Sequence, residues 1–195
     1  IYTLSLHDAL PIYKEIITAR AGKEIVVKMG AVKDKTKTHP DVNIPLTTNI
    51  DDIVNDPEID IVVELMGGVE FPFEVAKKAL KNGKHYVTAN KAMLAYHRYE
   101  LQESAGSLAF GYEASVAGGI PIIKALKNGL SANHINSIRG IMNGTCNYIL
   151  TKMINEGVSY DKVLKEAQEL GYAEADPTFD VGGYDAAHKL LILSS

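Results

Sequence analysis

Four carboxylates and a lysine lie close together near the carboxyl end of the chain, in LGYAEADPTFDVGGYDAAHK. They belong to Glu174, Asp176, Asp180, Asp185 and Lys189. Carboxylates held close together repel one another unless a positive group lies among them, so the ammonium group of an amino acid would suit this segment as a ligand. The spacing is not that of a calcium-binding loop. The alternative is a solvated acidic loop, in which Asp176 and Pro177 form only a turn.

Asp185 and Lys189 stand four residues apart in DAAHKLLIL, a stretch that is typical of a helix. Residues four apart in a helix project from the same face. A carboxylate beside an amine on a rigid helix can take part in proton transfer. The alternative is an ordinary surface ion pair, which stabilises a helix by about 0.2–0.5 kcal/mol.

The composition is that of an ordinary globular protein, with 46% hydrophobic and 23% charged residues, which leaves enough apolar side chains for a core. A net charge of −4 and the lack of a Lys/Arg cluster argue against nucleic acid as a partner. A single cysteine, Cys146, excludes an intrachain disulfide, and no apolar run reaches the ~20 residues that span a bilayer. We therefore expect a cytoplasmic protein without a membrane partner.

Both ends of the sequence look unusual. Residues 1–12, IYTLSLHDALPI, correspond to one reading frame of a widely used sequencing adapter, and we interpret them as a non-native scar. At the other end an apolar helix is still running at Leu190–Leu193. We expect the chain to be a piece of a longer protein.

From about residue 25, short β-rich runs alternate with helical segments, which is typical of βαβ units around a parallel sheet. The strands are predicted at residues 24–32, 59–68, 84–89 and 107–113, and the run at 59–68 is apolar enough for a strand buried on both faces. Helices are predicted from Pro72 to about Asn82 and over residues 90–106. Further along, we expect a helix after Pro121, a strand at 134–144, and helices at 145–157 and 160–171.

Open parallel sheets bind ligands at the turns that follow their strands. Three such turns stand out, at residues 66–68, 89–91 and 113–119. A G-x-G-x-x-G turn for a pyrophosphate is missing. This turn should precede a strand like the one at residues 24–32 by about 20 residues, which falls within residues 1–12. Its absence is therefore only weak evidence against a dinucleotide site.

Four sequence blocks follow one another in the order seen in homoserine dehydrogenases. They are VVELMGGVEFPFEVAKKALKNGKHYVTANKAMLA, GYEASVAGGIPIIKALKNGL, GIMNGTCNYILTKM and LGYAEADPTFDVGGYDAAHKLLIL. The chain resembles this family from about Ile25 to its last residues, and four ordered blocks are far more specific than one motif. Enzymes of this family interconvert homoserine and aspartate semialdehyde with NAD or NADP, in threonine and methionine biosynthesis.

The resemblance implies an α/β fold in two parts. Residues 13–112 would form a partial Rossmann-type parallel sheet domain that binds the dinucleotide but lacks its first strand and glycine-rich turn. Residues 113–195 would form part of an α+β substrate and dimerisation domain. We expect the intact protein to be a homodimer and the present residues alone to show negligible turnover.

The resemblance also implies roles for the residues of the site. Lys91, Asp185 and Lys189 would handle the hydroxyl proton, with either lysine as the acid/base. Only a neutral lysine can accept a proton, directly or through water. The substrate would be held by four further residues: Glu174, Asp180, Tyr172 and Thr145. Without the resemblance, Lys91, which directly follows a predicted strand, would be interpreted as a solvated surface residue.

For the cofactor, the resemblance places Gly67, Gly68 and Asn90 beside the nicotinamide. In a Rossmann-type domain the residue after the second strand, here the strand predicted at 24–32, contacts the ribose of the cofactor. A basic residue there suits the 2′-phosphate of NADP, whereas an acidic residue suits the free ribose hydroxyl of NAD. The loop there offers Lys33, together with Lys35 and Lys37, beside Asp34. The sequence therefore favours NADP over NAD.

A further implied ligand is Na⁺, held by the carboxylate of Glu113 and the carbonyls of Val116, Gly118 and Ile120. Oxygen-only donors suit such a hard cation. The alternative is that these residues form a tight turn, in which the glycines are needed only for their backbone conformation.

Two rival hypotheses remain open. The first is another Rossmann oxidoreductase that acts on an amino acid or its semialdehyde. If it worked through a thiohemiacetal, it would need Cys146 as its nucleophile, yet no neighbouring base is evident for that residue. Without that role, Cys146 is a small core residue. The other rival is a non-catalytic piece that binds a partner or has no activity.

Overall fold

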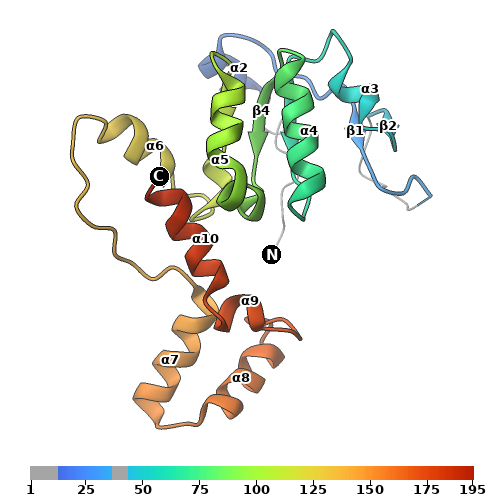
Figure 1. The fold of residues 1–195 in the computed structure, drawn as a ribbon. Coiled ribbons are helices and arrows are strands. Elements are labelled where there is room, and N and C mark those ends of the chain that lie inside the picture. The colour runs from blue at the N-terminus through green and yellow to red at the C-terminus, as the bar shows by residue number, and fades with distance from the viewer. Residues whose placement is uncertain (1–12, 37–43) are drawn as a thin grey trace.

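The computed structural model describes residues 13–36 and 44–195. Figure 1 shows a parallel sheet with helices packed against it, and a separate group of helices below. The predicted scar at residues 1–12 and Lys37 lie outside the described residues. No helix in the described part of the chain is long and apolar enough to cross a membrane.

The main sheet has three parallel strands in the order β3-β4-β5, namely β3 (Ile61–Glu64), β4 (His85–Thr88) and β5 (Phe110–Gly111). Helix α4 (Glu70–Lys81) connects β3 to β4, and α5 (Lys91–Ala105) connects β4 to β5. The predicted βαβ arrangement is confirmed, and so are both connecting helices. Parallel pairing brings the carboxyl ends of the strands to one edge of the sheet.

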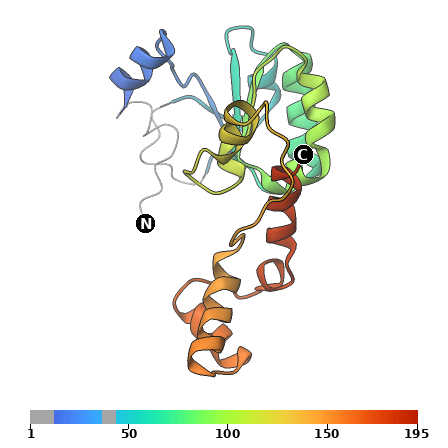
Figure 2. The same cartoon turned by 90° about the vertical axis from the view of Figure 1, so that its left-hand side faces the viewer.

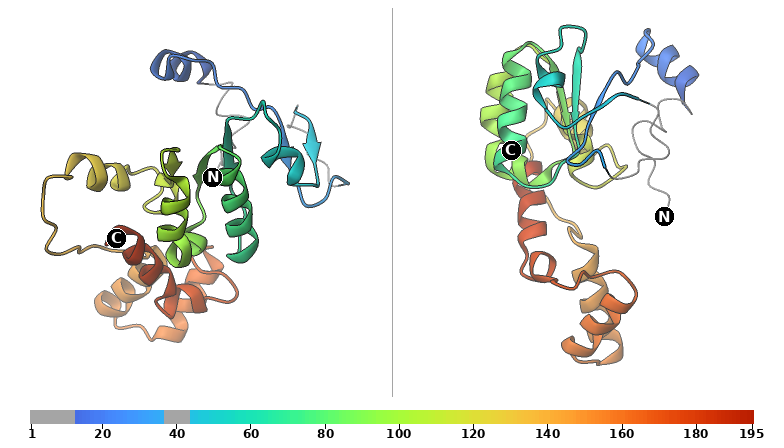
Figure 3. Two further views of the ribbon diagram at one scale, coloured as in Figure 1. Left: turned by 45° about the horizontal axis from the view of Figure 1, so that its top comes forward. Right: turned by 90° about the vertical axis from the view of Figure 1, so that its right-hand side faces the viewer.

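Helices α4 and α5 lie on the same face of this sheet, as the right panel of Figure 3 shows. Their apolar stripes meet the sheet in one core cluster that includes Val62, Phe73, Tyr86, Met93 and Leu101. Because α5 begins directly after β4 and is pressed onto the sheet by this core, the first residue of α5 is held at the carboxyl edge.

The opposite face of the sheet is open in the described part of the chain. Burial alternates along β3, with Val62 and Glu64 buried but Ile61 and Val63 exposed, and Val87 of β4 is exposed as well. The prediction that residues 59–68 form a strand buried on both faces is therefore wrong here. The physical reason is that both connecting helices pack on one side.

A smaller parallel pair joins β1 (Gly30–Ala31) to β2 (Leu46–Thr47), beside the short helix α3 (Asp51–Val54). Helix α2 (Lys14–Ala21) precedes β1 in the chain. The strand predicted at residues 24–32 is thus confined to its end. The strand predicted at 107–113 is shorter too, because η1 (Glu113–Ser115) begins soon after β5. In both places, two of the described residues pair with a neighbouring strand.

The second half of the chain is helical. Its elements are α6 (Ile122–Lys124), η2 (Ala125–Gly129), α7 (Gly144–Glu156), α8 (Tyr160–Glu169), α9 (Thr178–Val181) and α10 (Tyr184–Leu193). The helices predicted around residues 145–157, 160–171 and 184–193 are confirmed. The strand predicted at 134–144 is wrong: residues 134–143 have no regular structure, since no strand of the described residues lies beside them to pair with.

Helix α10 joins the two halves. Figure 2 shows α7, α8 and α9 extending away from the sheet, with α10 running back up to it. Helix α10 packs against α5, and Ile192 shares an apolar cluster with Leu94 and Tyr112. Helices α7 and α8 have a core of their own around Ile149 and Val163. This packing brings the start of α10 beside the start of α5.

Candidate active site

Lys91 is the first residue of α5, and the residues before it fix its position. The side chain of Asn90 caps the helix by accepting a hydrogen bond from the backbone N–H of Met93 (3.0 Å). Its amide nitrogen donates to the carbonyl of Gly68 (2.9 Å), in the loop after β3. The Thr88 hydroxyl donates to the buried carboxylate of Glu64 (2.7 Å). The carboxyl ends of β3 and β4 are thereby tied together under Lys91.

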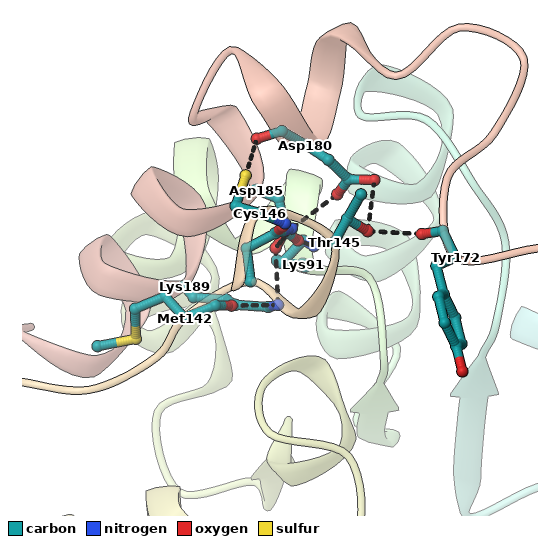
Figure 4. Close-up of polar contacts among 9 residues, drawn as sticks. Lys91, Met142, Thr145, Cys146, Tyr172, Asp180, Asp185 and Lys189 are labelled. Carbon is teal, nitrogen blue, oxygen red and sulfur yellow. Dashed lines mark hydrogen bonds and ion pairs between the residues drawn. The ribbon is translucent and has the colours of Figure 1, made fainter. Parts of the chain in front are cut away.

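Asp185 lies in the first turn of α10 and receives two cations. Its Oδ1 forms an ion pair with Lys91, and its Oδ2 lies 2.7 Å from the Nζ of Lys189. Figure 4 shows Lys91, from α5, meeting Asp185 and Lys189, which both belong to α10. The predicted proximity of Asp185 and Lys189 on one helix face is confirmed.

Lys189 is anchored by the segment that precedes α7. Its Nζ donates a second hydrogen bond to the carbonyl of Met142 (2.7 Å). An ammonium group has three N–H donors, so Lys189 has one donor left, whereas the ion pair of Lys91 with Asp185 leaves it two. Both lysines can therefore still donate to a small polar ligand.

Asp180, in α9, is the second carboxylate of the cluster. Its Oδ1 accepts a hydrogen bond from the side-chain amide of Asn143 (2.8 Å). Its Oδ2 lies at 3.5 Å from the Thr145 hydroxyl. That hydroxyl donates to the carbonyl of Tyr172 (2.6 Å). Asp180, Thr145 and the backbone carbonyl of Tyr172 therefore lie within one hydrogen-bonded group, whereas the ring of Tyr172 is exposed.

The electrostatic environment of Asp185 is strongly positive. Its side chain is only 7% exposed, and burial by itself would raise the pKa of the carboxyl. Hydrogen bonds from Asn143, Lys189 and Lys91 outweigh that effect and lower the pKa of Asp185 to about 2. The carboxylate therefore stays charged across the physiological range. Its charge is suited to holding the two ammonium groups rather than to exchanging a proton itself.

Glu174, the fourth predicted substrate residue, lies apart. It is exposed on the loop after α8, where its backbone carbonyl accepts a hydrogen bond from Gln168 (3.1 Å). Among the described residues, no hydrogen bond or ion pair joins its carboxylate to Asp180 or Asp185. Its side chain is free to turn toward a ligand.

The predicted cofactor residues divide into two groups. Gly67, Gly68 and Asn90 lie together at the carboxyl edge of the sheet, whereas Lys33 is exposed after β1. A Cβ atom placed on Gly67 or Gly68 would have no other atom within 4 Å, and Gly68 has a φ of 87°. This edge therefore offers open space and close backbone approach, which a flat ring can use.

The predicted sodium ligands lie in the turn between β5 and α6. Both carboxylate oxygens of Glu113 accept backbone N–H groups at the start of α6, from Ile123 (2.8 Å) and Lys124 (2.9 Å). The carbonyl of Ile120 accepts a hydrogen bond from the N–H of Ile122 (2.8 Å). The Glu113 oxygens and the Ile120 carbonyl are therefore already hydrogen-bonded within this turn, and each keeps a second lone pair. Val116 is buried, and Gly118 has a φ of 58°.

Several residues that the sequence did not single out also belong to the site. Phe179 presents its ring to the Nζ of Lys91, 5.3 Å from the centroid. His188 meets the rings of Phe179 and Tyr96 edge-on. Asn143 joins the two carboxylates. Asn143 alone had a sequence signal, since an asparagine before Gly-Thr-Cys is a typical helix cap.

Cys146 lies beside this cluster but has an environment unsuited to a nucleophile. Its Sγ is 3.2 Å from the carbonyl of Asp180. Burial raises the pKa of the thiol, and the charges of Asp180 and Asp185 raise it further. Because the thiolate is the reactive form, this environment argues against the thiohemiacetal alternative.

A hollow of about 650 Å³ lies elsewhere on the surface, between α3 and α4. It is lined by Ile50, Asp51, Phe71, Lys77, Lys78 and Lys81 among others. Lys78 is already paired there with Asp51 (2.5 Å). The hollow lacks the paired lysines on one carboxylate that distinguish the cluster around Asp185.

Comparison with known sequences decides the family. The sequence profile described as "Homoserine dehydrogenase, NAD binding domain" matches residues 14–113, and the profile described as "Homoserine dehydrogenase" matches residues 121–195. The chain belongs to the homoserine dehydrogenase family. The first profile confirms that the parallel sheet part is an NAD(P)-binding domain of Rossmann type, and the second shows that the start of the homoserine dehydrogenase domain follows it.

Relatives within the family are close in sequence. The homoserine dehydrogenase of Helicobacter pylori is 58% identical over 182 residues, which cover 93% of this chain and 43% of that protein. The Pseudomonas aeruginosa enzyme is 51% identical over 183 residues, covering 93% of this chain and 42% of that protein. The chain thus spans less than half the length of the curated relatives it matches.

Solved structures of family members have the same fold. A homoserine dehydrogenase from Thiobacillus denitrificans superposes with a TM-score of 0.89 at 54% identity, covering 95% of this chain and 44% of that one. A hyperthermophilic archaeal homoserine dehydrogenase in complex with NADPH superposes with a TM-score of 0.71 at 28% identity, covering 93% of this chain and 53% of that one.

Proposed function

We propose that the full-length protein interconverts L-homoserine and L-aspartate 4-semialdehyde with NAD(P), as a step of threonine and methionine biosynthesis. The observation that carries this proposal is the placement of Lys91 and Lys189 on the two oxygens of one buried carboxylate, with Asp180 beside them. Membership of the homoserine dehydrogenase family gives the reaction.

The lysines would manage the hydroxyl proton. As hydride leaves the alcohol carbon, the hydroxyl must lose its proton while the carbonyl forms. Asp185 holds both ammonium groups near the point where this oxygen would lie, and each has at least one N–H direction left for it. Either lysine, Lys91 or Lys189, can serve as the acid/base.

The carboxylates would bind the ammonium end of the amino acid. Asp180 keeps one oxygen free of strong hydrogen bonds, because its contact with Thr145 is long, at 3.5 Å. Glu174 would turn inward from its exposed loop to meet the same ammonium group. Tyr172 and Thr145 would support Asp180 through the hydrogen bond between them (2.6 Å).

The nicotinamide would lie against the carboxyl edge of the sheet, beside Gly67, Gly68 and Asn90. The open space around both glycines fits a flat ring. The bound cofactor supplies the hydride acceptor or donor. Asn90 would keep this edge rigid through its hydrogen bonds to Gly68 and Met93. Lys33 supports a preference for NADP, since a cation after the second strand can meet the 2′-phosphate.

We also propose Na⁺ as a ligand of Glu113 and the carbonyls of Val116, Gly118 and Ile120. At Glu113 the cation would take the remaining lone pairs of the two carboxylate oxygens, which already accept N–H groups from the start of α6. A homodimer and a cytoplasmic location remain predictions.

The test is a steady-state assay of the purified full-length protein. We expect reduction of NADP, and more slowly of NAD, that depends on L-homoserine and is not supported by L-serine or L-threonine. Equal activity with all three amino acids, or none with L-homoserine, would contradict the proposed function. A preference for NAD would contradict only the role of Lys33.

A further inference from the structure

We propose that Asn143 is a positioning residue of this site, whose side-chain amide holds the carboxylates of Asp180 and Asp185 together for binding of the amino acid. The proposal rests on the proposed function and adds to it a residue that acts through Asp180 and Asp185. The Nδ2 atom of Asn143 lies 2.8 Å from Asp180 Oδ1 and 2.8 Å from Asp185 Oδ2.

The orientation of the Asn143 amide is fixed from both ends. Its Oδ1 accepts the backbone N–H of Cys146 (2.7 Å) as the cap of α7, and its Nδ2 meets the two carboxylates. If the amide turned over, the NH₂ group would face an N–H donor and the oxygen would face two anions. The buried side chain therefore has one satisfied arrangement.

Asn143 is also the link between the two acids. Both lysines of the cluster contact Asp185, and within the described residues neither forms an ion pair with Asp180. The two carboxylates belong to different short helices, α9 and α10, and like charges repel at this range. The side-chain amide of Asn143, as a donor shared by both carboxylates, keeps Asp180 close to Asp185 although no lysine pairs with Asp180.

The amide achieves this without adding charge. A lysine or arginine in its place would neutralise one of the carboxylates and weaken their attraction for a substrate ammonium group. A neutral donor leaves both carboxylates ionised. It also contributes to the low pKa of Asp185, together with the two lysines.

Two substitutions separate this role from helix capping. Asn143→Ser keeps an efficient cap but loses the bridging donors. Asn143→Asp keeps both the cap and the shape of the side chain, but it places a third carboxylate where the donor was. Asn147→Ser, at an exposed asparagine of the same helix, serves as the control.

The experiment measures kcat and KM for L-homoserine in the full-length protein across the pH range. We expect kcat/KM to fall about tenfold or more in both variants, mainly through KM. For Asn143→Asp we also expect partial recovery as the pH falls, because a protonated carboxyl can donate again. The control should match the unsubstituted protein.

A second readout does not depend on turnover. Carboxyl NMR titration of the same proteins should show a higher pKa for Asp185 in Asn143→Ser than in the unsubstituted protein. If folded Asn143→Ser keeps its kcat/KM and Asn143→Asp keeps the normal pH profile, or if the pKa of Asp185 does not move, the role of Asn143 is overturned. Lack of homoserine oxidation by the unsubstituted protein would instead contradict the proposed function, and the titration would still test the bridge.

Discussion

Lys91 and Asp185 are 94 residues apart in the sequence and form an ion pair in the folded chain. Lys91 begins a helix of the NAD(P)-binding domain, and Asp185 lies in the first turn of the helix that returns from the helices below. The contact places the amine of Lys91, in the NAD(P)-binding domain, against the carboxylate of Asp185, in the helical second half of the chain. The candidate site therefore exists only where the two parts meet.

Asp185→Asn should destabilise the full-length protein. The folded state lowers the pKa of this carboxyl from 3.8 to about 2, which corresponds to about 2 kcal/mol of the free energy of unfolding at neutral pH. Because the pKa is depressed, this contribution is present above pH 3.8 and is lost as the pH falls toward 2. Urea unfolding at several pH values measures it.

The control for this change is Asp60→Asn, at an exposed aspartate. It should leave the free energy of unfolding nearly unchanged. If Asp185→Asn also leaves the free energy of unfolding unchanged at neutral pH, the ion pairs of Asp185 contribute little to stability.

His188→Phe should remove a pH-dependent loss of stability. Burial lowers the pKa of His188 from its ordinary value of 6.5, and the charge of Lys91 lowers it further. The unfolded chain therefore binds a proton more readily than the folded chain, and stability falls as the pH drops below about 6.5. Phenylalanine can keep the edge contacts with Phe179 and Tyr96.

The measurement is the free energy of unfolding between about pH 7 and pH 5. We expect a shallower decline in His188→Phe than in the unsubstituted protein. Identical declines would show that His188 is not the group that titrates.

Cys146 should react slowly with thiol reagents. Its thiol has a raised pKa, so the reactive thiolate is scarce near neutral pH. We expect iodoacetamide to modify Cys146 more slowly than a free cysteine, as followed by mass spectrometry of the intact protein.

The matching variant, Cys146→Ser, should retain most of the homoserine-dependent turnover, since a hydroxyl can keep the hydrogen bond to Asp180. Complete loss of turnover in a folded Cys146→Ser protein would instead favour covalent chemistry through the thiol.

The sequence predicted those parts of the fold that depend on local pattern. The helices at Glu70–Lys81, Lys91–Ala105 and Tyr184–Leu193 follow from the local pattern of apolar residues, and the first of them also from the Asn82-Gly83 pair that ends it. The errors arose where structure depends on a distant partner. Residues 134–144 lack a neighbouring strand to pair with, and β3 has helices on only one face.

The same distinction applies to the site. The spacing of Asp185 and Lys189 along one helix predicts their contact. The proximity of Lys91 to Asp185 follows from no local pattern, and only the family resemblance suggested it. Asn143 could be read as a cap from its neighbours in sequence. Its hydrogen bonds to Asp180 and Asp185, which are 37 and 42 residues away in the sequence, cannot be predicted from the residues around it.

The central claim is that one of the two lysines on Asp185, Lys91 or Lys189, transfers the hydroxyl proton. The kcat of the full-length protein with L-homoserine and NADP tests it most directly. We compare Lys91→Met and Lys189→Met with Lys165→Met, an exposed control. The variant that removes the acid/base should lose about 10²–10⁴ in kcat while remaining folded, and the control should lose none. If both Lys91→Met and Lys189→Met keep near-normal kcat, the claim is contradicted.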